Sequence, residues 1–185
     1  MQLGAKMIFS DESGFTTVPN AKATWAPRGY TPTLRVCLKR GRLNVMGALV
    51  VSPKQSHINL HALTTMDKVA AEEIVCFMSE VLRRERGLLF WFWDGAPIHE
   101  NASVRCFLAE HPRLRLIGLP AYAPELNPCE GVWAQAVDQL SSKLILSLQQ
   151  LGLEVAKSLR RTRDSQHLLW ACVKASNLPW PLLSH

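Results

Sequence analysis

The chain has 185 residues, 48% of them hydrophobic and 19% charged, and carries a net charge of +6. This length predicts one domain that folds without disulfides or a structural metal, and the composition excludes wholesale disorder. No apolar run approaches the ~20 residues that span a bilayer, and no secretory signal opens the sequence, which predicts a cytoplasmic protein without a membrane partner.

Three strands are predicted at the start of the sequence. Residues 5–12 form a short apolar segment that ends in two acids, and residues 43–51 form a buried segment. Residues 57–63 alternate as a strand with one solvated face does. The segment 13–42 is rich in Thr, Pro, Gly and basic residues, which predicts an extended loop with hairpin character. Short turns between the strands favour an antiparallel meander.

The periodicity then changes to that of a helix. Apolar residues at i, i+4 and i+7 predict a helix over 66–86, with Thr65 as its N-cap and Gly87 as its stop. Residues 88–93, LLFWFW, predict a strand that is buried on both faces.

The rest of the sequence predicts mostly helices, over 100–110, 127–141, 144–161 and 164–176, with a strand over 114–119. The order predicts an α/β fold: a mixed sheet of three antiparallel strands followed by parallel strands, with helices on both faces. We expect a single domain over residues 1–185.

Two acids stand at the ends of predicted strands. Asp11 ends the first strand, and Asp94 follows LLFWFW directly. In a sheet of this order the first strand is usually central, and the strand after the helix can lie parallel beside it, which predicts that the two carboxylates are neighbours. They then repel each other unless a cation lies between them, and hard oxygen ligands suit Mg²⁺ or Mn²⁺. Spacing leaves open whether Asp11 or Glu12 joins Asp94, and an ordinary Asp-Gly turn at 94–95 is the alternative.

Two further residues are site candidates. Glu130 opens a predicted helix, and its alternative role is in a capping-box arrangement with Asn127 as N-cap and Pro128 at the first helical position. His99 follows Asp94 by five residues and is expected either to polarise a water or contact a phosphate, or to be a surface histidine.

The positive charge is concentrated in one block. Residues 13–66, the basic block, contain no Asp or Glu, whereas the rest of the chain is almost neutral. A polyanion such as DNA is the expected partner, and the alternative is that basic residues solvate a loop and protect a strand edge. The basic residues of the block are Lys22, Arg28, Arg35, Lys39, Arg40, Arg42 and Lys54.

Three motifs carry a resemblance to a known family. FSDESGF, WFWDGAPIHE and LPAYAPELNPCEGVW resemble the three catalytic blocks of DDE transposases of the mariner-type superfamily, in its bacterial insertion-sequence branch. The segment TWAPRGYTP resembles that family's stretch after the first strand. The likeness extends from Met7 to about Pro179, and 35 residues separate Asp94 from Glu130, as suits the family.

The resemblance implies a ribonuclease-H-like fold and a two-metal phosphodiester chemistry with two Mg²⁺ or Mn²⁺ ions. Asp11, Asp94 and Glu130 match the family's three metal-binding catalytic acids, which favours Asp11 over Glu12. The implied reaction cleaves transposon ends and joins their 3′-hydroxyls to target DNA.

The family also implies partners and alternatives. A homodimer in the active complex is expected, in association with the bacterial chromosome. Relatives carry a helix-turn-helix region before the first catalytic Asp, and this sequence begins about ten residues before Asp11, so we expect that region to be absent or supplied by a separately encoded end-binding protein. The alternative functions are a non-catalytic DNA-binding or dimerising remnant and a ribonuclease-H-like nuclease.

Overall fold

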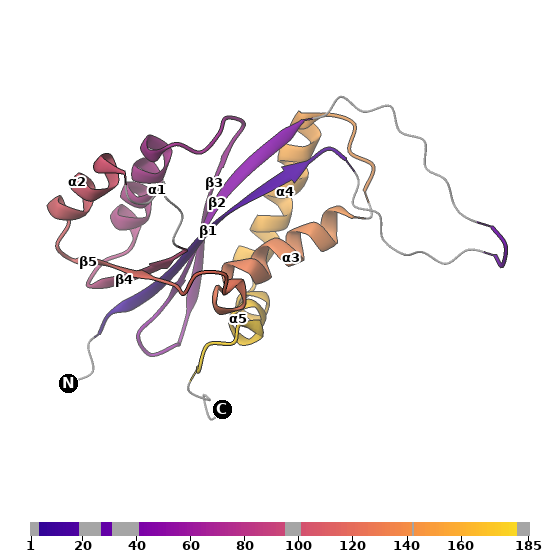
Figure 1. Cartoon of the computed structure of the whole chain (residues 1–185). Helices are drawn as coiled ribbons and strands as arrows, with labels where there is room; N and C mark the ends of the chain where they lie inside the picture. Colours follow the sequence, from indigo (N-terminus) through magenta and orange to yellow (C-terminus); the bar gives the residue numbers. More distant parts are fainter. Residues whose placement is uncertain (1–3, 19–26, 31–40, 95–100, 142, 181–185) are drawn as a thin grey trace.

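The strands form one mixed sheet with helices on both faces (Figure 1). The computed structural model describes residues 4–18, 27–30, 41–94, 101–141 and 143–180. The strands are β1 (Lys6–Thr16), β2 (Arg42–Val51), β3 (Ile58–Thr65), β4 (Leu89–Trp93) and β5 (Leu114–Gly118). The helices are α1 (Ala71–Arg84), α2 (Ala102–Glu110), α3 (Cys129–Leu140), α4 (Leu148–Arg163) and α5 (Gln166–Ala175), and the 3-10 turn η2 (Pro124–Leu126) precedes α3.

The strand order is β3-β2-β1-β4-β5, so β1 is central as predicted. β1 pairs antiparallel with β2 and parallel with β4, and β2 pairs antiparallel with β3. A parallel neighbour requires a crossover connection, which α1 provides between β3 and β4. The expected meander followed by parallel strands is therefore confirmed.

Two separate cores fill the spaces above and below the sheet. On one face α1 and α2 pack with Ile8 and Trp91, and on the other α3, α4 and α5 pack with Phe9 and Phe15. Successive strand residues point to opposite faces, so Asp11 shares the face of Phe9 and Phe15. Alternation within β1 therefore directs Asp11 toward α3.

Two local predictions are wrong. β1 continues through residues 13–16, where the composition predicts a loop, because each residue through Thr16 pairs with β2. Thr65 does not cap α1, since it ends β3 and pairs with Asn44. The cap position is Ala70, whose N–H donates to Glu73 Oε2 at 2.9 Å. Ladder pairing thus extends both strands beyond the bounds that periodicity gave.

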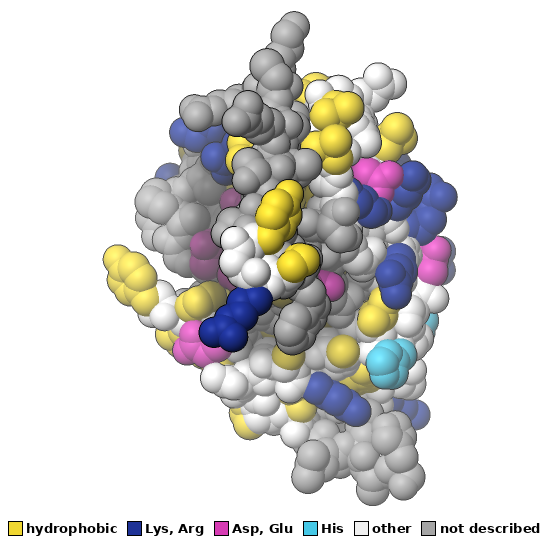
Figure 2. Space-filling model, turned by 90° about the vertical axis from the view of Figure 1, so that its right-hand side faces the viewer, with side chains coloured by type: hydrophobic (Ala, Val, Ile, Leu, Met, Phe, Trp, Pro, Cys, Tyr) yellow, Lys and Arg dark blue, Asp and Glu magenta, His cyan; other side chains and the backbone are white. Residues whose placement is uncertain are grey.

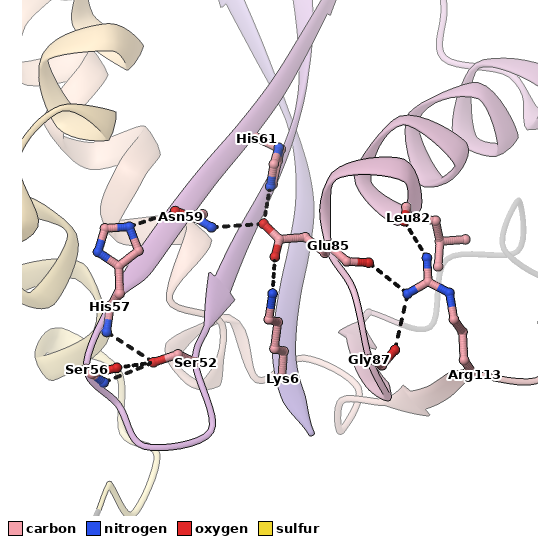
Figure 3. A network of polar contacts seen from close by, with 10 residues as sticks. All are labelled: Lys6, Ser52, Ser56, His57, Asn59, His61, Leu82, Glu85, Gly87 and Arg113. Atoms are coloured by element: carbon pink, nitrogen blue, oxygen red, sulfur yellow. Dashed lines mark hydrogen bonds and ion pairs between the residues drawn. The ribbon is translucent and has the colours of Figure 1, made fainter. Parts of the chain in front are cut away.

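A buried carboxylate holds the end of α1 to the sheet (Figure 3). Glu85 is 2% exposed and accepts hydrogen bonds from Lys6 Nζ at 2.7 Å and Asn59 Nδ2 at 2.9 Å, and lies 2.8 Å from His61 Nε2. These contacts, of which that to His61 is the strongest, lower the pKa of Glu85 to about 2. Arg113 meanwhile donates to the carbonyls of Leu82 and Glu85, at the end of the helix where carbonyls lack intrahelical partners, and to that of Gly87 just beyond it.

In the part of the chain that the structure describes, no helix combines the length and apolar character needed to cross a membrane.

Candidate active site

The sheet brings two of the predicted acids to one place because its central pairing stops early. β1 pairs with β4 only from Lys6 to Phe9, where Phe9 is opposite Phe92. Asp11 and Asp94 each follow these paired residues by two positions. Beyond Phe9 the β4 side of β1 is therefore open to other parts of the chain.

The chain at and just before the start of α3 binds the backbone of β1 here. Asn127 Nδ2 donates to the carbonyl of Ser10 at 3.0 Å, and the Cys129 thiol donates to that of Phe9 at 2.9 Å. Both side chains are buried, so these bonds satisfy polar groups that would be costly to bury without a partner. The same segment carries Glu130 to the cleft.

Three carboxylates line one cleft of about 390 Å³. Asp11 is half-buried, whereas Asp94 and Glu130 are exposed. On the face turned to the viewer in Figure 2, some acidic side chains are recessed behind nearer atoms and others lie at the surface, and Lys and Arg side chains lie both at the edges and near the centre. The remaining lining residues come from the segment between β5 and α3: Leu119, Pro120, Ala121, Tyr122, Ala123, Pro124 and Asn127.

Asp11 is electrostatically the most perturbed of the three acids. Burial, together with the smaller effects of the Glu130 and Asp94 charges, raises its pKa from 3.8 to about 7. The Trp133 indole N–H, which donates to Asp11 Oδ2 at 2.8 Å, and the backbone N–H of Glu12 both oppose this shift. A cleft with this negative charge favours a bound cation. Positive charge there would stabilise the ionised form of Asp11 against both burial and the repulsion from Glu130 and Asp94.

The carboxylates of the cleft are suitable ligands for a hard divalent ion. All three side chains supply carboxylate oxygen, which suits Mg²⁺ or Mn²⁺. Within the described ranges, no three His, Cys, Asp or Glu side chains converge closely enough to hold one ion together. Asp94 and Glu130 are exposed, whereas Asp11 is half-buried and accepts the Trp133 indole N–H.

The predicted capping box at Glu130 is not formed. α3 begins at Cys129 with Pro128 in the cap position and no side-chain capping bond. Asn127 Oδ1 instead accepts the N–H of Cys129 at 3.1 Å. Glu130 is thus left in the lining of the cleft rather than engaged as a cap.

The other predicted residues are distributed differently. Arg28 lies in a turn apart from the sheet (Figure 1), and Arg42 is exposed at the start of β2. Lys54 lies in the turn after β2, at the opposite end of that strand. Outside the described residues fall His99, Lys22, Arg35, Lys39 and Arg40.

Two site residues were missed as individual candidates, although both lie in the third motif. Trp133 follows Glu130 by three positions, a spacing that puts both on one side of a helix, and this signal was available in the sequence. Tyr122 lines the cleft with a fully exposed side chain and a φ of 58°, a left-handed conformation that is uncommon for a bulky residue. Its backbone conformation has no clear sequence signal.

Comparison with known proteins identifies a family and a fold. A family model described as DDE superfamily endonuclease matches residues 6–152. Among solved structures, a Mos1 transposase paired-end complex with the left transposon end matches with a TM-score of 0.65 at 19% identity, over 94% of this chain and 52% of that one. No curated protein is similar at a significant level.

Two further matches are to Mos1 mariner paired-end complexes. The complex with Mn has a TM-score of 0.64 at 18% identity, over 94% of this chain and 52% of that one. The complex with Mg has a TM-score of 0.63 at 18% identity, over 95% and 57%. The expected ribonuclease-H-like fold is confirmed, although this chain spans only about half the length of these transposases. Because the family model covers most of the chain, the chain belongs to the DDE superfamily endonucleases.

Proposed function

We propose that this chain is the catalytic domain of a metal-dependent transposase. The observation that carries the proposal is the meeting of Asp11, Asp94 and Glu130 in one cleft, within a family described as endonucleases. The expected DNA substrates are transposon ends and a target, and the expected assembly is a homodimer. A separately encoded helix-turn-helix protein is the proposed end-binding partner.

The chemistry is two in-line displacements at phosphorus. Water first attacks a phosphodiester at the transposon end, and the bond to the 3′-oxygen breaks, leaving a 3′-hydroxyl. That hydroxyl then attacks a target phosphodiester and displaces the target's own 3′-oxygen. Two divalent ions, when bound by the three acids, would activate the attacking oxygen and stabilise the leaving one.

The protein's own groups contribute position and charge. Asn127 and Cys129 hold the β1 backbone beside Asp11, so that carboxylate keeps its place when DNA binds. Pro120, Ala121 and Tyr122 form part of the wall of the cleft and would limit how the DNA strand enters. Basic side chains such as Arg42 are proposed to bind phosphates beside it.

Isosteric variants test the assignment of the acids. Asp11→Asn and Asp94→Asn should reduce Mg²⁺- or Mn²⁺-dependent nicking of supercoiled DNA carrying the element's ends to background, with a supplied end-binding partner. Glu12→Gln, one residue from Asp11 on the other face of β1, and Asp138→Asn, an exposed acid of α3, are the matched controls.

The outcomes distinguish three functions. Salt-dependent DNA retention without cleavage by the unchanged chain would indicate a DNA-binding remnant. Cleavage of an RNA–DNA hybrid but not of duplex DNA would indicate a ribonuclease-H-like nuclease. Equal nicking by Asp94→Asn and the unchanged chain would exclude the assigned site.

A further inference from the structure

The indole of Trp133 is buried against the most deeply placed carboxylate of the cleft. Its Nε1–H donates to Asp11 Oδ2 at 2.8 Å, and the side chain is 5% exposed. A hydrogen bond to an ionised carboxylate is about twice as strong as one between neutral groups. The contact joins the third motif to the first, across 122 positions of sequence.

The ring is locked in place by its surroundings. Gly47 lies opposite Asp11 in the β1–β2 ladder, and a Cβ at this glycine would lie 2.6 Å from Cη2 of Trp133 and 2.9 Å from Cζ2. The ring of Phe15 packs edge-on at 6.3 Å between centroids. The absence of a side chain at residue 47 therefore makes the slot in which the indole reaches Asp11.

We propose that Trp133 is a positioning residue that fixes the Asp11 carboxylate for binding of divalent cations, with Gly47 as its obligatory slot. This inference rests on the proposed function. The indole N–H already holds one carboxylate oxygen of Asp11 before any cation binds. The Asp11 side chain therefore loses little rotational freedom when it binds a cation. Partners of this kind around metal ligands typically contribute about 10–100-fold in metal affinity or activity.

A second tryptophan provides a matched control. Trp91 in β4 donates its Nε1–H to Ser10 Oγ at 2.6 Å, one residue before Asp11 on the opposite face of β1. It is 1% exposed, so replacing it likewise removes a buried indole that donates to a side chain of β1, but it leaves the Trp133–Asp11 hydrogen bond intact. Trp133→Phe removes the hydrogen bond to Asp11 Oδ2, whereas Trp91→Phe removes the hydrogen bond to Ser10 Oγ.

The experiment measures Mn²⁺ affinity of the full chain without DNA, from the electron paramagnetic resonance signal of free Mn²⁺. Trp133→Phe should bind Mn²⁺ about 10–100-fold more weakly, whereas Trp91→Phe should bind as the unchanged chain does. Binding of end DNA in Ca²⁺ should be unchanged in both, and cleavage by Trp133→Phe should require more Mn²⁺.

The slot is tested by a double-mutant cycle. Gly47→Ala should weaken Mn²⁺ binding as Trp133→Phe does, because the new Cβ displaces the indole. In the Trp133→Phe background, the smaller side chain lacks the indole atoms Cζ2 and Cη2 that a Cβ at residue 47 would meet. Gly47→Ala should therefore have little further effect there. Circular dichroism and thermal unfolding identify variants that fail to fold, and the Trp133→Phe comparison does not depend on Gly47→Ala.

Asp94→Asn separates this inference from the proposed function. If Asp94→Asn weakens Mn²⁺ binding but Trp133→Phe does not, the positioning role is overturned and the catalytic assignment stands. If neither variant changes Mn²⁺ binding, the metal site itself is wrong. Equal weakening by Trp133→Phe and Trp91→Phe would indicate general damage to β1 and would also overturn the inference.

Discussion

At the scale of single residues, two carboxylates show how neighbours decide the cost of burial. Asp11 lies beside two other acids, and its pKa is raised to about 7. Glu85 is surrounded by His61, Lys6 and Asn59, and its pKa falls to about 2. Burial disfavours the ionised form in both, and only Glu85 has enough donors and positive charge to reverse that effect. The first environment is the one proposed to bind a cation, and the second stabilises the fold.

The low pKa of Glu85 predicts an acid-sensitive contribution to stability. Its folded pKa lies below the ordinary value of 4.5, so the contribution is fully present above pH 4.5 and is lost as the pH falls toward 2. Its size is on the order of 3 kcal/mol. Chemical unfolding between pH 7 and 2 should show this loss, and Glu85→Gln should be destabilised at neutral pH and less sensitive to acid.

Glu80→Gln is the matched control for this measurement. Glu80 forms ion pairs with Arg83 and Arg84 on the exposed side of α1, where solvent screens them. We expect it to change stability little at either pH. A Glu80→Gln effect as large as that of Glu85→Gln would contradict the assignment to the buried network.

At the scale of elements, α3 is held on two sides. Asn127, Cys129 and Trp133 bind it to β1, and Gln135 Nε2 donates to the carbonyl of Leu168 in α5 at 3.1 Å. Glu130 stands on the turn between these attachments. The helix that presents this acid is thus fixed against both the sheet and its neighbouring helix.

Two helical glycines test the close packing of α3. A Cβ at Gly131 would lie 2.9 Å from Cα and Cβ of Cys172 in α5, whereas one at Gly152 of α4 would meet nothing within 4 Å. Gly131→Ala should therefore lower the free energy of unfolding by about 1–3 kcal/mol. Gly152→Ala should raise it by about 0.5–1 kcal/mol, because alanine favours the helix. Equal effects in urea unfolding would show that α3 and α5 can separate at small cost.

At the scale of the whole molecule, the acids of the cleft and the residues of the basic block lie in different parts of the chain. The acids of the cleft lie where β4 ends, and the acid-free basic block contains the chain from the end of β1 through β3. Of its basic residues, Arg42 begins β2 beside the end of β1, whereas Lys54 lies at the other end of β2. This arrangement predicts that DNA phosphates are bound mainly by the part of the block near Arg42.

The salt dependence of DNA binding tests this distribution. Replacing Lys39, Arg40 and Arg42 together with Ala should weaken binding, and the slope of log K against log salt should become shallower by about 0.9 for each phosphate that the variant no longer neutralises. The matched control replaces Arg160, Arg161 and Arg163, at the end of α4, and removes the same charge. An unchanged slope for the first variant would place the phosphate-binding residues elsewhere.

Much of the fold follows from local patterns. The strands around LLFWFW and LNVMGALVV and the later helices were predictable within a few residues, because apolar periodicity depends only on neighbours in sequence. Strand ends were less accurate, since β1 and β3 are extended by pairing with β2. The central place of β1 also followed from the order of the elements.

By itself, the sequence determined the three acid-bearing motifs and the location of the basic block, because these are local properties of the chain. It did not determine that Asp11 lies within β1 rather than at its end, because pairing with β2 extends the strand to Thr16. Only the tertiary structure showed from geometry that Asp11, rather than Glu12, lines the cleft. It also showed that Trp133 contacts Asp11 and that Gly47 leaves space for the indole. The same holds for Glu85 with Lys6, which lie 79 positions apart. Such contacts join residues far apart in sequence, and their energy depends on burial and partners that exist only once the sheet has formed.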